Sequence, residues 1–229
     1  MINRSAKYLA IAATVFVAVT GIAIPAQAEE APPIAPNTLA QLNAGFEELG
    51  VAVDARPALL EAYAQGKTWD NSSGAAPVTD DTYRVGITDY TRKVYSDGSV
   101  TLTSIERPTT PSAGGGIQPM GLSGCKYLLS AGVATWSNCK VEKNNGILTE
   151  WYHAGYWQGP SGAGVSLTNT WDWDIQAAGG ACSKDYLGTP TSTKARIRAY
   201  CTVISGIGSS YPYLDLDVTK STAAVNANW

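Results

Sequence analysis

Apolar and polar residues alternate along several segments of the carboxy-terminal half, which predicts β-strands with one buried face. In residues 165–175 the odd positions are almost all apolar, and the even positions are all Ser, Thr or Asp. A period of two places five apolar side chains of this run on one face: Val165, Leu167, Trp171, Trp173 and Ile175. Residues 195–203 and 213–218 alternate in the same way. Three strands with one dry face each indicate a layered β structure.

Turn-forming residues divide residues 120–229 into β-prone runs of about ten residues. Groups of Gly, Pro, Asn and Ser recur between these runs, for example at 144–146, 159–162 and 188–190. Short strands at this spacing are typical of an antiparallel sandwich or barrel. We therefore expect a mainly β chain whose carboxy-terminal domain, residues 120–229, is an antiparallel β-sandwich.

The preceding region, residues 29–107, has the pattern of two short helices and a β-hairpin. Leucines and Phe46 recur at helical spacing from Asn37, a candidate cap, to Gly50. A second amphipathic run extends from Asp54 to Gly66. The Asp97-Gly98 pair separates two β-prone runs, a strong hairpin signal. Residues 108–119 combine Pro, Thr and a Gly triplet, so they are expected to be a linker between two domains.

The first 28 residues have the three parts of a secretory signal peptide. Arg4 and Lys7 precede an uncharged apolar run over residues 8–24, and Ala26-Gln27-Ala28 fits a cleavage site. The run is short for a bilayer-spanning helix, and Pro25 closes it. The expected location of the mature protein is therefore extracellular, with no membrane attachment after cleavage.

Charge and cysteine content fit that location. Without residues 1–28 the chain has 14 Lys and Arg against 19 Asp and Glu, a net charge of −5. This acidic balance, without a basic block, argues against nucleic acid as a partner. Four cysteines in an exported chain indicate two disulfides. Of three connectivities we favour Cys125–Cys139 and Cys182–Cys201, because each pair brackets a segment that resembles a hairpin.

No metal or cofactor is expected from the sequence. No two cysteines have the short spacing of a zinc knuckle, and His153 is the only histidine. No cofactor-binding motif rises above background. The candidate chemistry therefore lies in aromatic side chains, in carboxylates and in His153.

The aromatic residues are the main candidates for a binding site. Phe46 is the only phenylalanine after residue 28, whereas seven tryptophans and eleven tyrosines remain. One strand-like run carries them at both parities: Trp151, Tyr152, Tyr156 and Trp157, here called the β-run aromatics. A strand buries one parity well, so the other is left as an aromatic patch unless the amino-terminal helices or hairpin cover it. Exposed rings of this kind stack on sugar faces or extended peptides.

A catalytic site is the alternative for the polar residues of the same region. His153 with Asp172 or Asp174 on the next strand would form an acid/base pair. Asp172, Asp174, Asp215 and Asp217 alternate on polar strand faces, as glycosidase carboxylates or calcium ligands would. Cross-strand pairing with Arg196 and Arg198 explains the same acids without function. Residues 159–164 do not match a nucleophile elbow.

Several turn and hairpin motifs carry a resemblance. Trp69-Asp70 followed by Gly74-Ala75-Ala76-Pro77-Val78, the Tyr95–Ser99 hairpin and Ser123-Gly124-Cys125 resemble segments of uncharacterised secreted proteins of actinobacteria, the high-GC Gram-positive bacteria. The resemblance covers most of the chain after residue 28. It implies secretion and a bacterial source, and it implies no activity.

The sequence thus favours a secreted, non-catalytic binding protein. Its expected partner is an extracellular or cell-envelope polysaccharide, contacted through exposed Trp and Tyr. Two alternatives belong to other classes: a small secreted glycoside-type hydrolase that uses Asp residues, and a subunit or inhibitor that docks on another secreted protein.

Overall fold

The computed structural model describes residues 33–109, 124–160, 164–202 and 211–229. The predicted signal peptide, residues 1–28, lies outside the described residues, as does most of the predicted linker. Residues 31–229 form one compact unit, and the description below concerns that unit alone. None of the helices in the described ranges is long and apolar enough to cross a membrane.

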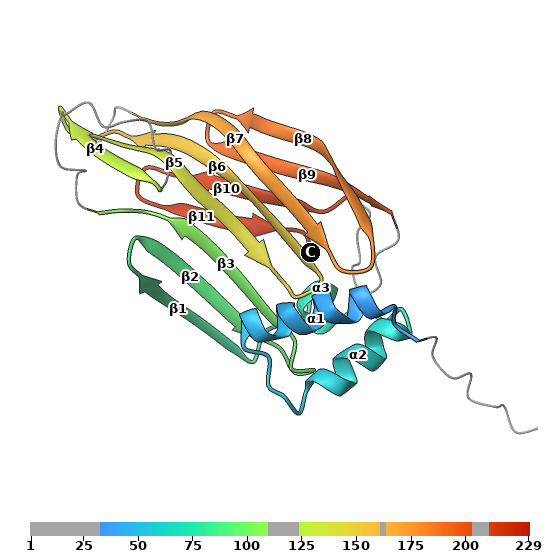
Figure 1. Ribbon diagram of the computed structural model, residues 1–229. Helices are drawn as coiled ribbons and strands as arrows, with labels where there is room; N and C mark the ends of the chain where they lie inside the picture. The colour runs from blue at the N-terminus through green and yellow to red at the C-terminus, as the bar shows by residue number, and fades with distance from the viewer. Residues whose placement is uncertain (1–32, 110–123, 161–163, 203–210) are drawn as a thin grey trace, which may run out of the picture. The chain divides into compact units, whose positions relative to one another are not determined.

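Two antiparallel sheets and three helices make up this unit (Figure 1), which confirms the expected fold class. The helices are α1 (Pro36–Leu49), α2 (Arg56–Ala64) and α3 (Asp70–Ser73). The first sheet has the order β1-β2-β3-β5-β6-β7, with β4 also paired to β5. Its strands are β1 (Thr79–Val85), β2 (Thr88–Val94), β3 (Val100–Glu106), β4 (Lys126–Ser130), β5 (Val133–Asn144), β6 (Leu148–Gln158) and β7 (Val165–Ala177). The second sheet has the order β11-β10-β9-β8, from β8 (Ala181–Thr191), β9 (Lys194–Thr202), β10 (Tyr213–Val218) and β11 (Ala223–Ala227).

Helices α1 and α2 lie where the periodicity predicts them. In α1 the apolar stripe is buried, and the helix ends at Gly50, whose φ of 62° is the left-handed conformation that glycine adopts readily. The start differs by a residue or two, because Ala35 rather than Asn37 precedes the helix and Pro36 occupies its first turn. In α2 the buried residues are Leu59 and Tyr63.

The amino-terminal strands contain one turn more than expected. The sequence predicts one hairpin in this region, through the Asp97-Gly98 turn. The structure divides this region at Gly86-Ile87, so that β1 and β2 form a hairpin of their own. Gly86 has a φ of 59°, which explains why the chain turns there. The β2–β3 hairpin through Asp97-Gly98 is present as predicted.

Strands from both sides of the predicted linker belong to one sheet. β5 pairs along the same edge with β3, through Leu102–Ile105, and further along with β4, through Lys126–Ser130. The described structure does not test whether residues 29–107 and 120–229 fold independently, so the two-domain division stays a prediction. The β3–β5 pairing is the contact that such a test must address.

Two hydrophobic cores support the fold. The first lies between the sheets and includes Val141, Tyr152, Ile197 and Leu216. The second lies under the helices, where α1 and α2 pack on the β5–β6 turn and on the start of β3. A side chain at Gly45 of α1 would collide with the backbone of Gly146, 2.9 Å from its carbonyl oxygen. This close approach of helix to turn requires glycine.

Both expected disulfides are present, Cys125–Cys139 and Cys182–Cys201. Cys182 and Cys201 are directly opposite each other on β8 and β9. Cys125 immediately precedes β4, and Cys139 lies on β5. Each bridge therefore closes a local hairpin, as the spacing predicted.

Candidate functional site

The β-run aromatics lie on both faces of β6. Tyr152 and Tyr156 are fully buried in the first core, where Tyr156 stacks on Trp136 with ring centroids 4.9 Å apart. Trp151 and Trp157 are half-buried on the opposite, outer face of the sheet. Among the described residues, none of the four β-run aromatics belongs to the second core, which contains α1 and α2. Solvent therefore reaches the two tryptophans and not the two tyrosines.

Two bulges in β7 change the side on which one tryptophan lies. Tyr152 is opposite Trp173 and His153 is opposite Trp171, so Asp172 is an extra residue, with a φ of 43°. A second extra residue lies at Thr168. The prediction that Trp171 shares a face with Leu167 is therefore wrong. Trp171 lies on the outer face, beside His153.

Trp151, His153 and Trp171, here called the outer ring row, do not form a flat platform. The His153 ring is nearly parallel to Trp171, with centroids 6.3 Å apart, but stands at 83° to Trp151. Lys140 Nζ lies 5.0 Å from the ring centroid of Trp151, and Glu142 holds this lysine at 2.8 Å. The outer ring row is therefore not one flat surface, because Trp151 stands almost at a right angle to His153.

The residues of the catalytic alternative are partly brought together. His153 Nδ1 lies 3.3 Å from Asp172 Oδ2, but the contact lacks hydrogen-bond geometry. Asp174 instead accepts hydrogen bonds from the backbone of Ile175 and from Gln176. Asp172 is largely exposed, with 61% of its side chain accessible. The structure thus places His153 near one acid and gives the other an ordinary strand role.

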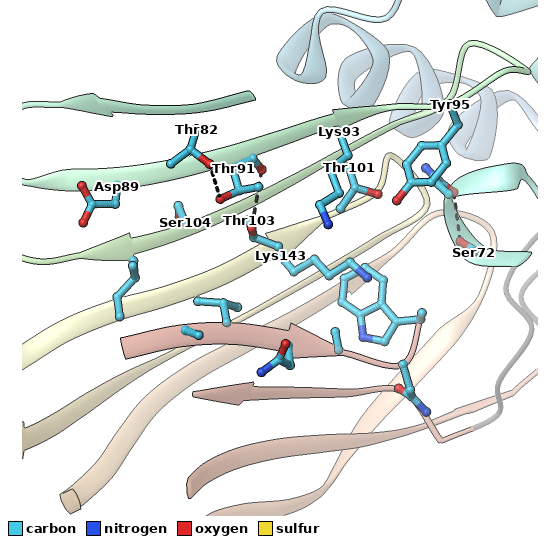
Figure 2. Close-up of a pocket in the computed structure, with 18 of the residues that line it drawn as sticks. Ser72, Thr82, Asp89, Thr91, Lys93, Tyr95, Thr101, Thr103, Ser104 and Lys143 are labelled. Carbon is cyan, nitrogen blue, oxygen red and sulfur yellow. Dashed lines mark hydrogen bonds between the residues drawn. The ribbon is translucent and has the colours of Figure 1, made fainter. Parts of the chain in front are cut away.

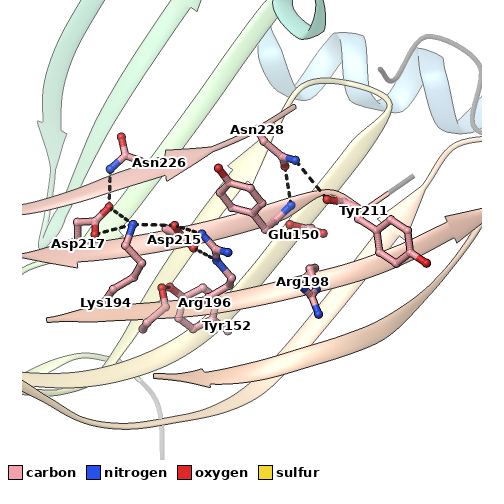
Figure 3. Close-up of polar contacts among 12 residues, drawn as sticks. Glu150, Tyr152, Lys194, Arg196, Arg198, Tyr211, Asp215, Asp217, Asn226 and Asn228 are labelled. Atoms are coloured by element: carbon pink, nitrogen blue, oxygen red, sulfur yellow. Dashed lines mark hydrogen bonds and ion pairs between the residues drawn. The ribbon is translucent and has the colours of Figure 1, made fainter. Parts of the chain in front are cut away.

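Asp215 and Asp217 lie on the outer face of the other sheet, in an ion-pair network (Figure 3). Asp215 is buried and takes a bidentate contact from Arg196, at 2.6 and 2.7 Å. Lys194 Nζ lies 2.9 Å from each of the two carboxylates. Arg198 pairs with Asp185 and not with either of these two aspartates. Cross-strand charge pairing therefore accounts for both aspartates.

A groove of about 670 Å³ lies between the β1–β3 part of the first sheet and the edge strand β11 of the second. Its volume is in the range of small-ligand sites. Its floor is formed by hydroxyl and charged side chains, which Figure 2 shows: Thr82, Asp89, Thr91, Lys93, Thr101, Thr103 and Lys143. Its other wall is residues 223–229, and Asn71, Ser72, Gly74 and Tyr95 also line it. The groove is therefore polar along its floor, with an indole in the opposite wall.

The strand register explains why these side chains share one surface. Thr101, Thr103 and Ile105 follow one another at every second position of β3, so their side chains lie on the same face. Ile105 belongs to the first core, so this is the inner face of the sheet. Lys93 is opposite Thr101 on β2, and Lys143 is opposite Thr103 on β5. The first sheet continues past β11, the edge of the second, and its inner face there is polar. That uncovered extension is the groove.

A buried lysine and a buried glutamate meet the indole of Trp229 beside the groove. Lys143 Nζ lies 4.4 Å from the ring centroid of Trp229, and Trp229 Nε1 donates to Glu150 Oε2 at 3.3 Å. Lys143 and Glu150 are cross-strand partners. Burial lowers the pKa of Lys143 to about 8, and Glu150 partly opposes that shift. Burial raises the pKa of Glu150 to about 8, opposed by the indole hydrogen bond and by Lys143.

Two polar atoms at this surface have no partner in the described structure. The Thr101 hydroxyl is buried without a hydrogen bond, and so is the second carboxylate oxygen of Glu150. Buried polar groups are usually paired, so each such atom requires an explanation. Thr101 lines the groove, so a ligand there would lie beside it.

Two of the motifs that carry the resemblance hold one end of the groove. Asp70 accepts a hydrogen bond from the backbone N–H of Asp97 at 3.3 Å, and Asp97 accepts one from that of Asp70 at 2.8 Å. Asn71 follows and donates to the carbonyl oxygens of Val100 and Asn145. The Trp69-Asp70 motif and the Tyr95–Ser99 hairpin are thus in direct contact, and they fix α3 against β3.

Sequence reasoning did not find the groove residues Lys93, Thr101, Lys143 and Trp229. One signal was available: β1 and β2 carry polar residues at both parities, so this hairpin has no dry face to bury. That pattern indicates a sheet extension whose inner face stays polar. The long-range approach of β11 to it has no local signature.

Within the described ranges, no group of three or more His, Cys, Asp or Glu side chains could hold a metal ion. No family model matches the chain, and neither a curated protein nor a solved structure does. The resemblance to secreted actinobacterial proteins stays a prediction.

Proposed function

We propose that this is an extracellular, non-catalytic binding protein that holds a segment of polysaccharide in the groove between β1–β3 and β11. The observation that carries the proposal is the lining. Hydroxyl and charged side chains form the floor, and the Trp229 indole lies in the opposite wall. Sugars offer many hydroxyl groups and an apolar ring face, so such a lining suits them.

The groove supports this function better than the outer face does. The outer ring row is bent at Trp151 and partly covered by Lys140, whereas the groove has an open volume and a side chain with an unpaired hydroxyl. Trp151 and Trp157 stay the alternative location for the same function. A peptide strand added to the edge of β11 is a different class of ligand, and the polar floor favours sugar over it.

The extracellular location is part of the proposal. Two disulfides are compatible with an oxidising environment. Export of the full chain from an actinobacterial host should give a protein that begins at Glu29, as measured by intact mass. A product that stays in the cell with residues 1–28 attached would contradict this part.

The binding proposal is tested by filling the groove. Thr91→Leu on the floor and Ala224→Leu on the opposite wall add bulk without charge. Retention on insoluble cell wall, chitin and plant polysaccharides is compared between this double variant and the wild type. The matched control is Thr88→Leu with Ala181→Leu, the same two changes on the outer face of β2 and on β8.

We expect the wild type and the control to be retained by at least one polysaccharide, and the groove variant to be lost from it. Retention of all three would place the site elsewhere, and Trp151→Ala would then test the outer face. Failure of every polysaccharide to retain the wild type would refute the function. Hydrolysis of a retained polymer, abolished by Asp172→Asn, would replace binding with the hydrolase alternative.

A further inference from the structure

We propose that the groove ligand carries an anionic group, a carboxylate or a phosphate, held between Lys93 and Lys143; this inference rests on the proposed polysaccharide binding. The two lysines flank β3 on the same face of the sheet, opposite Thr101 and Thr103 respectively. Both side chains extend into the groove (Figure 2). Two positive groups therefore face one polar surface.

The Lys143 ammonium group has an unusual environment. The residue is only 7% exposed, and burial is the largest cause of its lowered pKa, with the charge of Glu150 opposing it. The Trp229 ring, 4.4 Å away, provides the direct contact with its charge. Keeping an ammonium group in such a place is costly unless an acceptor pairs with it. An anion in the groove would be that acceptor.

The two lysines also repel each other. The charge of Lys93 contributes, after burial, to the lowered pKa of Lys143. A single anionic group between them converts this repulsion into two attractions. Charge-assisted hydrogen bonds from ammonium groups to carboxylate or phosphate oxygens are stronger than those between neutral groups.

A third donor lies next to the lysines. The Thr101 hydroxyl is buried and unpaired, on the residue directly opposite Lys93. A hydroxyl donates to a carboxylate or phosphate oxygen as readily as to water. Lys93, Thr101 and Lys143 together give two charged donors and one neutral donor on adjacent strands.

The acids near these lysines leave room for such a ligand. Asp80 pairs with Lys93 at 3.3 Å, but both side chains are more than a third exposed, so the pair is weak and exchangeable. Asp89 is held by Arg84 in a bidentate contact. Glu150 is bound by the Trp229 indole, and burial keeps its pKa raised, so it neutralises Lys143 incompletely at neutral pH.

The test compares polymers with and without negative charge. Affinity for polygalacturonate is measured against its methyl ester, which lacks the negative charge, and against a poly(glycerol phosphate) polymer. The protein is the mature chain, as wild type, Lys143→Met and Lys93→Met. The control is Lys140→Met, on the same strand as Lys143 but on the outer face.

We expect the wild type to bind the polyuronate or the polyphosphate, and which of the two it binds identifies the anionic group. Methyl esterification, Lys143→Met and Lys93→Met should each weaken binding at least about tenfold, and Lys140→Met should not. Should Lys143→Met fold poorly, Lys93→Met alone decides, because Lys93 is more exposed. Equal binding of the polyuronate and its ester, with no effect of either lysine, would overturn the inference and leave neutral polysaccharide binding intact. Binding of none of these polymers or of the neutral polysaccharides would overturn both.

Discussion

Lys143 and Glu150 face each other as cross-strand partners on β5 and β6. The indole of Trp229 contacts both, through its ring face for the lysine and its N–H for the glutamate. Both residues are almost fully buried. This arrangement connects the groove to the stability of the fold. Burying either charge lowers the free energy of unfolding, and pH determines how much of each charge is present.

Glu150→Gln should make the protein more stable, increasingly so as pH rises. The pKa of Glu150 is raised from 4.5 to about 8 in the folded state. The folded protein therefore holds an extra proton over this window, and its stability falls as pH increases through it. The variant lacks this loss, so its advantage should grow between about pH 4.5 and pH 8, to roughly 2–4 kcal/mol.

Denaturant unfolding of both proteins from pH 5 to 8.5 measures this difference, with Glu48→Gln on the exposed face of α1 as the control. A constant difference across the range would contradict it.

The pH dependence of stability has the opposite sign for Lys143, whose pKa is lowered to about 8. The cost of burying its charge disappears as pH rises from about 8 toward 10.5, so the wild type should gain stability relative to Lys143→Met over that window.

Thr101→Val should not destabilise the protein but should weaken binding. The Thr101 hydroxyl has no partner in the free protein, so a methyl group of the same shape removes an unpaired buried polar atom. Thr103→Val is the matched control on the same strand. It removes a hydrogen bond to the carbonyl oxygen of Thr91 and should cost about 0.5–1.5 kcal/mol. Chemical unfolding and polysaccharide retention are measured on both. A loss of stability in Thr101→Val with unchanged retention would assign that hydroxyl a structural role.

Two tyrosines of β6 should respond differently to loss of the hydroxyl group. Tyr152 donates to the carbonyl oxygen of Ala195 at 3.3 Å, whereas the Tyr156 hydroxyl is buried without a partner. Tyr152→Phe should therefore lose about 1 kcal/mol, and Tyr156→Phe should be neutral or stabilising. Thermal unfolding distinguishes them. Neither change should affect retention, and a loss of retention in a stable Tyr156→Phe variant would show that this ring reaches the ligand.

A protein cut within residues 114–116 should remain one particle. Ile105 belongs to the first core, and β3 pairs with β5 through Leu102–Ile105. A sequence-specific protease site inserted at the Gly triplet allows the cut, and gel filtration without denaturant measures the result. Fragments that separate while each unfolds cooperatively would establish two independent domains. Co-elution is the outcome that the shared sheet predicts.

Local patterns were sufficient for most elements and for both bridges, but they predicted neither α3 nor the turn between β1 and β2. Alternation found β7, β9 and β10, helical spacing found α1 and α2, and hairpin spacing found both disulfides. Alternation failed at Trp171, because an extra residue at Thr168 reverses the side on which the following residues lie, until the second extra residue at Asp172 restores it. No local pattern reports such a bulge when the extra residue is itself polar.

The candidate site was predicted only in part. The sequence indicated that one parity of the β6 aromatics is buried, and the structure identifies that parity as Tyr152 and Tyr156. The groove escaped prediction because its walls are more than 100 residues apart, in β1–β3 and in residues 223–229. Trp229 acquires its role only through contact with Lys143 and Glu150.

The most direct test of the groove as the binding site is a nuclear magnetic resonance titration of the indole N–H signals. An oligosaccharide from the polymer that retains the protein is added to the mature chain, with the tryptophan signals assigned. The account predicts that the Trp229 signal shifts and saturates, because its ring forms part of the groove and its N–H is bonded to Glu150. Saturating shifts at Trp151 or Trp157, with Trp229 unmoved, would contradict it and place the site on the outer face.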